Sequence, residues 1–123
     1  MKLEYVGLRV RDLDKATEFY TNVLGLELLR RRKMEWTGGE IAMLKDPTSG
    51  QMLELNWYPE EEYRGGDELD HLGFEVEDAE TFLVKLEEAG CEVAYPLEER
   101  GSYLYACATD PDGIWIEIYS EKR

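Results

Sequence analysis

The sequence predicts an α+β fold built from two βαβββ repeats, and three observations lead to this prediction. Residues 4–10 and 70–76 share one order of acid, ring, aliphatic residue, glycine, apolar residue, charge and valine. Each segment is followed by an acidic residue and then by apolar residues at helical spacing. Residues 46–55 and 110–118 share a turn that begins with Asp-Pro and leads into an alternating strand. Self-similarity of this kind indicates a repeated structural unit.

The first repeat is expected to hold one helix between its first strand and three later strands. The helix begins after Asp12, a favourable N-cap residue, and ends at Gly25. Apolar side chains recur between them at helical spacing: Leu13, Ala16, Phe19, Tyr20, Val23 and Leu24. The strands of this repeat are predicted at residues 3–10, 26–36, 40–46 and 51–58.

The second repeat follows the same order, with its helix between Asp78 and Gly90. Its strands are predicted at residues 70–77, 91–96, 102–109 and 114–120. We expect a single domain over residues 1–123, with repeat one at 1–58, a linker at 59–69 and repeat two at 70–123. Its strands should form a curled mixed sheet around a concave pocket, with the helices covering the other face.

Strand alternation places the polar residues of both repeats on one kind of face. The first and last strands of each repeat have one purely apolar face, which we expect to pack under the helices. The opposite, mixed faces carry these residues: Tyr5, Arg9, Met52, Glu54, Asn56, Tyr58, His71, Trp115, Glu117 and Tyr119. Carboxylates beside large rings suit the wall of a ligand pocket. A solvated face or a dimer contact remains the alternative, because antiparallel sheets often expose one polar face.

Charge and composition exclude several classes of function. The net charge is −14, so a nucleic-acid partner is not expected. No apolar run approaches the length of a membrane span, and the first residues lack a signal-peptide pattern, so we expect a cytoplasmic protein. The basic run at 30–33 is interpreted as a solvated strand face. Cys91 and Cys107 are expected to be reduced and to carry no chemistry.

Two motifs resemble the glyoxalase/bleomycin-resistance/dioxygenase (vicinal oxygen chelate) superfamily. Residues 19–26, Phe-Tyr-Thr-Asn-Val-Leu-Gly-Leu, resemble its helix-to-strand segment. Residues 110–113, Asp-Pro-Asp-Gly, followed by Glu117, resemble its final strand. With the doubled repeat, the resemblance covers almost the whole chain and is closest in pattern to glyoxalase-type lyases. It implies a small-molecule substrate and a homodimer.

The resemblance also implies a metal site with one ligand on the first and last strand of each repeat. Glyoxalase-type members use His or Gln, then Glu, His and Glu; carried over one by one, the last three fall on Glu54, His71 and Glu117. The first falls on Tyr5, which departs from the His or Gln of the family. A phenol is a poor metal ligand unless the ion itself lowers its pKa and removes its proton. Three protein ligands still make a catalytic site. The implied cofactor is a divalent Ni, Zn or Mn ion.

The resemblance leaves two classes of function open. The first is a metal-dependent lyase or isomerase acting on an α-keto or hemithioacetal-like substrate, with Glu117 as the catalytic base. A thiol cofactor would then be held through its carboxylate by Arg9, although this arginine can equally serve to neutralise an acidic face. The second is a metal-free binding protein that sequesters a small aromatic cation. The residues expected to bind substrate are Arg9, Asn56, Tyr58, Trp115 and Tyr119.

An extradiol dioxygenase is excluded by the histidine count. Such enzymes hold iron with two histidines and one carboxylate, whereas this chain has a single histidine. Exchange of strands between identical subunits would still supply one histidine per site.

Overall fold

The computed structural model describes residues 2–35, 37–59 and 71–122. It divides into two compact units, Met1–Gly65 and Gly66–Arg123, and each unit contains one of the predicted repeats. Both repeats have the predicted order of strand, helix and three strands. Apart from Pro59, the linker predicted at 59–69 lies outside the described residues.

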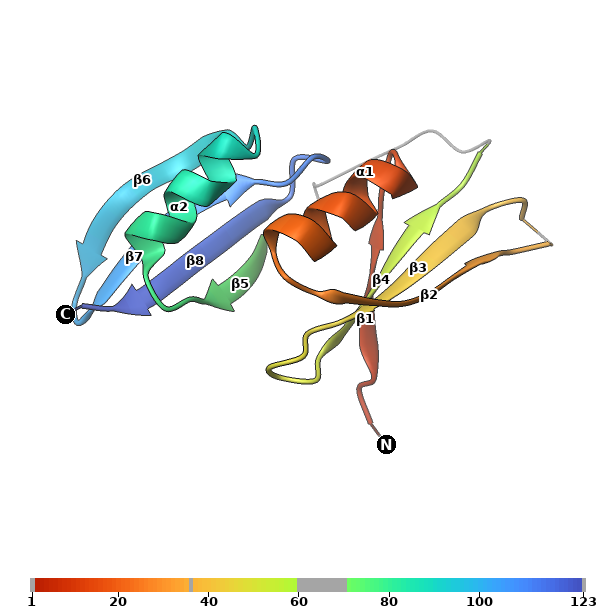
Figure 1. The fold of residues 1–123 in the computed structure, drawn as a ribbon, viewed down its shortest axis with the longest axis horizontal. Coiled ribbons are helices and arrows are strands. Elements are labelled where there is room, and N and C mark those ends of the chain that lie inside the picture. The colour runs from red at the N-terminus through yellow and green to blue at the C-terminus, as the bar shows by residue number, and fades with distance from the viewer. Residues whose placement is uncertain (1, 36, 60–70, 123) are drawn as a thin grey trace. The chain divides into compact units, whose positions relative to one another are not determined.

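The first unit is a four-stranded mixed sheet with helix α1 across one face (Figure 1). Strand β1 is parallel to β4, and the other neighbouring strands are antiparallel, in the order β1-β4-β3-β2. Its elements are β1 (Tyr5–Arg9), α1 (Leu13–Glu18), η1 (Phe19–Val23), β2 (Glu27–Lys33), β3 (Glu40–Lys45) and β4 (Met52–Trp57).

The second unit repeats this plan in the order β5-β8-β7-β6, with helix α2 across one face (Figure 1). Strands β5 and β8 form the parallel pair. Its elements are β5 (His71–Glu75), α2 (Ala79–Glu88), β6 (Val93–Arg100), β7 (Tyr103–Thr109) and β8 (Trp115–Glu121). The α+β class and the mixed sheets are therefore confirmed. No helix in the described part of the chain is long and apolar enough to span a membrane.

Both helices begin with the same side-chain cap. The Asp12 carboxylate accepts a hydrogen bond from the backbone N–H of Lys15 at 3.1 Å. The Asp78 carboxylate accepts from the backbone N–H groups of Glu80 at 3.0 Å and Thr81 at 3.3 Å. These bonds satisfy N–H groups that have no partner inside the helix, so the predicted starts of both helices are confirmed.

The first helix ends differently from the second. Its last residues, Phe19–Val23, form a π-helical turn, whereas the spacing of apolar residues predicts an ordinary helix as far as Gly25. The caps Asp12 and Asp78 are offset by 66 positions, but the positive-φ glycines Gly25 and Gly90 are offset by 65. The first repeat therefore has one residue more, and a π-turn takes up such an insertion without ending the helix.

Alternation along the strands correctly predicts which face is buried. Leu53 and Leu55 of β4 are buried on the face toward α1, and Ile116 and Ile118 of β8 on the face toward α2. Trp115, Glu117 and their neighbours on the mixed faces remain exposed or half-buried. Each unit thus has its own apolar core under its helix and leaves its mixed face available for a site.

The predicted bounds 91–96 are wrong for strand β6, which runs over Val93–Arg100. Proline cannot donate a hydrogen bond to a strand ladder, so Pro96 would be expected to interrupt the pairing. The pairing with β7 instead shifts register between Tyr95 and Glu98, and this irregularity accommodates Pro96 within an edge strand.

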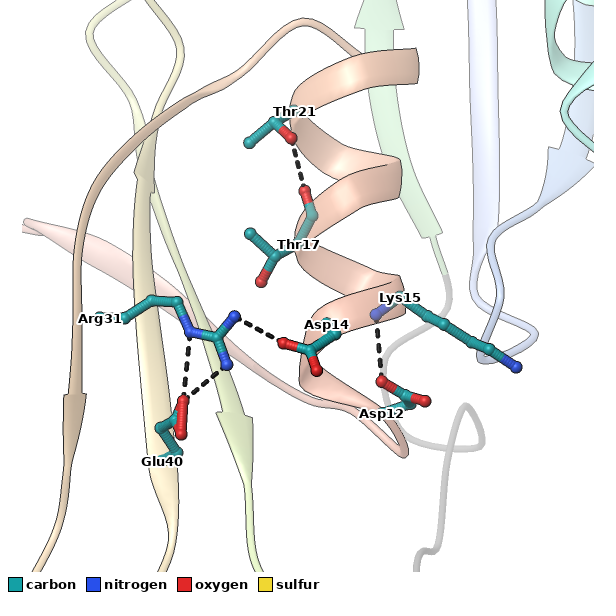
Figure 2. A network of polar contacts seen from close by, with 7 residues as sticks. All are labelled: Asp12, Asp14, Lys15, Thr17, Thr21, Arg31 and Glu40. Atoms are coloured by element: carbon teal, nitrogen blue, oxygen red, sulfur yellow. Dashed lines mark hydrogen bonds and ion pairs between the residues drawn. The ribbon is translucent and has the colours of Figure 1, made fainter.

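The basic run of the first repeat lies on β2, all of whose residues are exposed, as expected of a solvated strand. The Arg31 guanidinium nevertheless donates to Asp14 of α1 at 2.7 Å and to Glu40 of β3 at 2.6 and 3.1 Å (Figure 2). These two carboxylates raise the pKa of Arg31 through hydrogen bonds. The run therefore connects α1 to the sheet of its own unit.

A turn that begins with aspartate sets up the last strand of each repeat. The buried Asp110 carboxylate accepts hydrogen bonds from the backbone N–H groups of Asp112 and Ile114, both at 2.8 Å. In the first repeat, the less buried Asp46 accepts from the Thr48 backbone N–H at 2.9 Å. In both turns an aspartate carboxylate accepts hydrogen bonds from backbone N–H groups, but only Asp110 is buried.

Replacing Asp110 with alanine should therefore destabilise the protein by about 2–3 kcal/mol, because one buried and one part-buried N–H group lose a charged acceptor. Urea denaturation measures this loss. Asp46→Ala is the matched control at the shallower turn and should cost about 0.5–1.5 kcal/mol. Equal losses in the two variants would contradict the importance of burial at Asp110.

Candidate active site

The predicted ligands lie on the parallel strand pair of each unit. In the register of β1 with β4, Tyr5 pairs with Met52 and Gly7 with Glu54. In the register of β5 with β8, His71 pairs with Trp115 and Gly73 with Glu117. Each glutamate thus lies opposite a glycine, and Tyr5 or His71 lies two residues before that glycine on the same face. The two repeats place these residues at equivalent positions.

His71 and Glu117 are in direct contact on the mixed face of the second unit. The imidazole Nε2 of His71 lies 3.1 Å from Oε2 of Glu117. Gly73, opposite Glu117, has open space where a side chain would begin, so nothing on that side separates the two groups. The Glu117 side chain is 25% exposed and that of His71 44%, so the pair lies at an accessible surface and is partly shielded from water.

The other oxygen of Glu117 is held by a residue that the sequence analysis did not identify. The phenol of Tyr105 on β7 donates a hydrogen bond to Oε1 of Glu117 at 2.5 Å. Burial raises the pKa of Tyr105, and the hydrogen bond to Glu117 raises it further. The phenol therefore keeps its proton at neutral pH, and both carboxylate oxygens of Glu117 have a partner.

The ring of Tyr105 belongs to a group of three neighbouring rings, which we call the aromatic cluster: Tyr95, Tyr105 and Trp115. The Tyr95 ring meets the Trp115 ring edge-on at 5.3 Å and lies 6.5 Å from the Tyr105 ring. The Arg100 guanidinium lies over the Tyr105 ring, 3.7 Å from its centre. Tyr119, another predicted substrate contact, is also on this face, with its ring 5.9 Å from that of Tyr103. The second unit therefore presents aromatic rings beside the Glu117 carboxylate on its mixed face.

The first unit brings together a different pair of the predicted residues. The Arg9 guanidinium lies 4.4 Å from the centre of the Tyr58 ring, a cation–π contact. The Asn56 amide is 3.4 Å from the backbone carbonyl of Glu54. Glu54 itself is half-buried, and Tyr5 is 42% exposed. These side chains share the mixed face of β1 and β4, as alternation predicts.

The donor set fits a divalent ion in one respect that the structure shows directly. Two ligand atoms that bind one ion at about 2.1 Å and at a right angle lie about 3 Å apart. The Nε2 of His71 and Oε2 of Glu117 have this separation, 3.1 Å. Within the described residues, no three His, Cys, Asp or Glu side chains gather to hold an ion. Two predicted ligands lie on each repeat, and the convergence of all four stays a prediction.

Neither cysteine has the features of a nucleophile. Both are free thiols; Cys107 is fully buried, and Cys91 is half-buried. Burial, followed by the negative charge of Asp110, raises the pKa of Cys91 to about 11. A thiol reacts as its thiolate, and this shift keeps Cys91 protonated at physiological pH.

Alkylation of Cys91 by iodoacetamide at pH 8 should therefore be about 10–100-fold slower than that of free cysteine. The folded state favours the protonated thiol. Its contribution to stability is complete below the ordinary thiol pKa and is lost as pH rises toward about 11. Mass spectrometry of the modified peptide measures the rate, and a rate equal to that of free cysteine at pH 8 would contradict the shift.

Comparison with known proteins shows similarity along the whole chain. The family profile described as "Glyoxalase/Bleomycin resistance protein/Dioxygenase superfamily" matches residues 2–118. The lactoylglutathione lyase of Neisseria meningitidis serogroup A is 36% identical, over 99% of this chain and 92% of its own length. That of Salmonella typhimurium is 33% identical, over 99% and 94%. The trypanothione-dependent glyoxalase I of Leishmania major has a TM-score of 0.81 at 26% identity, over 98% of this chain and 88% of its own.

The extent of these similarities matters because both repeats carry predicted ligands. The curated relatives align over 99% of this chain, so the similarity covers both repeats. The similarity shows that the chain is an enzyme, a glyoxalase-type lyase. The chain belongs to the glyoxalase/bleomycin resistance protein/dioxygenase superfamily.

Proposed function

We propose that this protein is a metal-dependent lyase that isomerises the hemithioacetal of an α-keto aldehyde and a thiol to a 2-hydroxy thioester. The observation that carries the proposal is the contact between His71 and Glu117, a nitrogen and an oxygen donor 3.1 Å apart on the face where both are expected. Relatives that are 33–36% identical are lactoylglutathione lyases, whose name specifies a thioester of this class.

The proposed cofactor is a divalent nickel, zinc or manganese ion held by His71, Glu117 and Glu54, with Tyr5 at the fourth position. A mixture of imidazole and carboxylate donors suits these ions. When bound, such an ion stabilises negative charge that develops on neighbouring substrate oxygens. The phenol of Tyr5 is a weaker donor than the imidazole at the equivalent position of the second repeat, so the site should bind metal less tightly than a four-ligand site.

Glu117 is the proposed catalytic base. Its carboxylate takes the proton from the carbon that bears sulfur and returns it to the adjacent carbonyl carbon, while the hydroxyl proton passes to the neighbouring oxygen. Substrate and product are isomers, so the step needs no oxidant or reductant. Arg9, with Tyr58 and Asn56 beside it, is the proposed contact for the carboxylate of the thiol. Trp115 and Tyr119 are the proposed apolar contacts.

A thiol panel tests this function. The purified protein, loaded with nickel, is given methylglyoxal together with glutathione, trypanothione or cysteine, and thioester formation is followed by its ultraviolet absorbance. We expect thioester formation with glutathione or trypanothione and no formation without a thiol. Failure with every thiol, by metal-loaded folded protein, would overturn the proposed function.

The aromatic cluster supports a second candidate, metal-free binding of a flat cationic compound. The exposed ring of Tyr95, the partly exposed ring of Trp115 beside it and the net charge of −14 favour such ligands. Quenching of tryptophan fluorescence by a planar aromatic cation, undiminished after treatment with a chelator and accompanied by an inactive thiol panel, would favour this function over the lyase.

We further propose that the enzyme is a cytoplasmic homodimer. Each sheet has open edges, and β1 carries the half-exposed apolar side chain of Val6 at one of them. Open edges are usually covered, and a second copy of the chain is the proposed cover. The two free cysteines suit a reducing compartment. Sedimentation should give twice the chain mass of 14.3 kDa; a monomer at micromolar concentration would contradict the dimer.

A further inference from the structure

We propose that Tyr105 is a positioning residue, which holds Oε1 of Glu117 so that Oε2 faces His71. The inference rests on the proposed function and deepens it, because it assigns a role to a residue outside the predicted ligand set. Tyr105 donates to Oε1 at 2.5 Å, while Oε2 lies 3.1 Å from the imidazole of His71. With one oxygen fixed, the carboxylate cannot turn away from the histidine without breaking that hydrogen bond.

The hydroxyl of Tyr105 is itself held in place by its surroundings. Tyr105 is only 8% exposed, because its ring lies beneath Arg100 and beside Tyr95. A rigid ring with two side-chain torsions positions a donor at a lower entropic cost than a long flexible side chain does.

The first repeat provides a comparison within the molecule. In the register of β3 with β4, Met43 pairs with Glu54 and Ile41 with Asn56. In the register of β7 with β8, Cys107 pairs with Glu117 and Tyr105 with Tyr119. Tyr105 and Ile41 therefore occupy equivalent positions, and isoleucine has no hydroxyl to donate. Among the described residues, only the second repeat has a tyrosine hydroxyl at this position, and this hydroxyl holds the glutamate that we propose as the base.

A purely structural role explains the hydrogen bond less well. Strands β7 and β8 already pair along seven residue positions through their backbones, so one more link adds little to their association. A carboxylate that ligates a metal, in contrast, gains from a hydrogen bond that fixes its orientation, and loss of such a partner usually weakens metal binding by about 10–100-fold.

The test compares Tyr105→Phe with wild type and with Tyr103→Phe. Phenylalanine removes only the hydroxyl and keeps the ring under Arg100. Tyr103 lies on the same strand, and its ring packs against Tyr119, so Tyr103→Phe is the matched loss of a hydroxyl. Calorimetric titration of nickel into the metal-free proteins should show affinity about 10–100-fold lower in Tyr105→Phe and unchanged in Tyr103→Phe. The visible spectrum of the cobalt-loaded protein should change only in Tyr105→Phe.

The outcomes separate this inference from the proposed function. Equal nickel affinity in wild type and Tyr105→Phe, with unchanged cobalt spectra, would overturn the role of Tyr105 and leave the lyase standing. If wild type itself binds no nickel, both fail. Thermal unfolding of the metal-free proteins identifies a fold effect: a purely structural Tyr105 would lower the melting temperature of Tyr105→Phe while the folded variant kept its nickel affinity.

Discussion

Replacing Glu117 with glutamine is expected to lower the turnover number for thioester formation by about 10²–10⁴-fold, the contribution of a well-placed general base. Glutamine has nearly the same shape but cannot accept the substrate proton. It also presents an amide group to partners that now meet two carboxylate oxygens, Tyr105 at Oε1 and His71 at Oε2. Steady-state kinetics of the nickel-loaded variant measures the effect.

The matched control for this variant is Glu121→Gln. Glu121 lies four residues further along β8, on the same face, and is exposed. The Glu121→Gln substitution removes the same charge from the same strand, so a general electrostatic effect of the net charge would appear in both variants. We expect Glu121→Gln to keep the turnover number of wild type. A Glu117→Gln enzyme that retained more than about a tenth of wild-type turnover would exclude Glu117 as the base.

Replacing His71 with alanine is expected to abolish measurable nickel binding, since it removes the only imidazole of the chain. Loss of one ligand also leaves the Glu117 carboxylate without its 3.1 Å neighbour. Binding by wild type should weaken as pH falls, because a protonated ring cannot ligate. Calorimetric titration at several pH values tests both expectations. Equal binding by wild type and His71→Ala would contradict a nitrogen ligand at this position.

A gain of affinity provides the complementary test at the equivalent position of the first repeat. Tyr5→His would complete the ligand set that the family resemblance implies and should tighten nickel binding. Tyr5→Phe is its control, because it keeps a ring but offers no donor atom. If Tyr5→His binds no more tightly than Tyr5→Phe, residue 5 is not at the metal site.

The repeats were predictable because each one uses the same local devices at corresponding positions. The caps Asp12 and Asp78 and the positive-φ glycines Gly25 and Gly90 are visible in the sequence, and the structure confirms their roles. Alternation correctly assigns the buried face of β8. The π-turn was not predictable, because one extra residue leaves the apolar spacing of a helix almost unchanged.

The candidate site was predictable only in part. Strand alternation and the family resemblance both pointed to His71 and Glu117, which the structure places in contact. Tyr105 was not predicted as a site residue, because its proximity to Glu117 depends on the register of β7 with β8, which local sequence does not determine. The sequence does contain one indication of its position. Tyr103 and Tyr105 alternate with Leu104 and Ala106, so the two tyrosines share the mixed face.

The aromatic cluster was missed for a related reason. Tyr95 reaches Trp115 from β6, across an irregularity in the pairing of β6 with β7 near Pro96. A strand predicted to end at residue 96 gave no reason to connect Tyr95 with the last strand. Contacts between strands that are not adjacent depend on several registers at once, so they are the least accessible to sequence reasoning.

Restoration of activity by added metal is the most direct test of whether this chain is a metal-dependent lyase. Protein treated with a chelator and then freed of it is assayed for thioester formation before and after addition of one equivalent of nickel. We expect no activity above the uncatalysed rate in the metal-free protein and recovery on addition of nickel. Full activity in the protein shown by elemental analysis to be metal-free would contradict the claim.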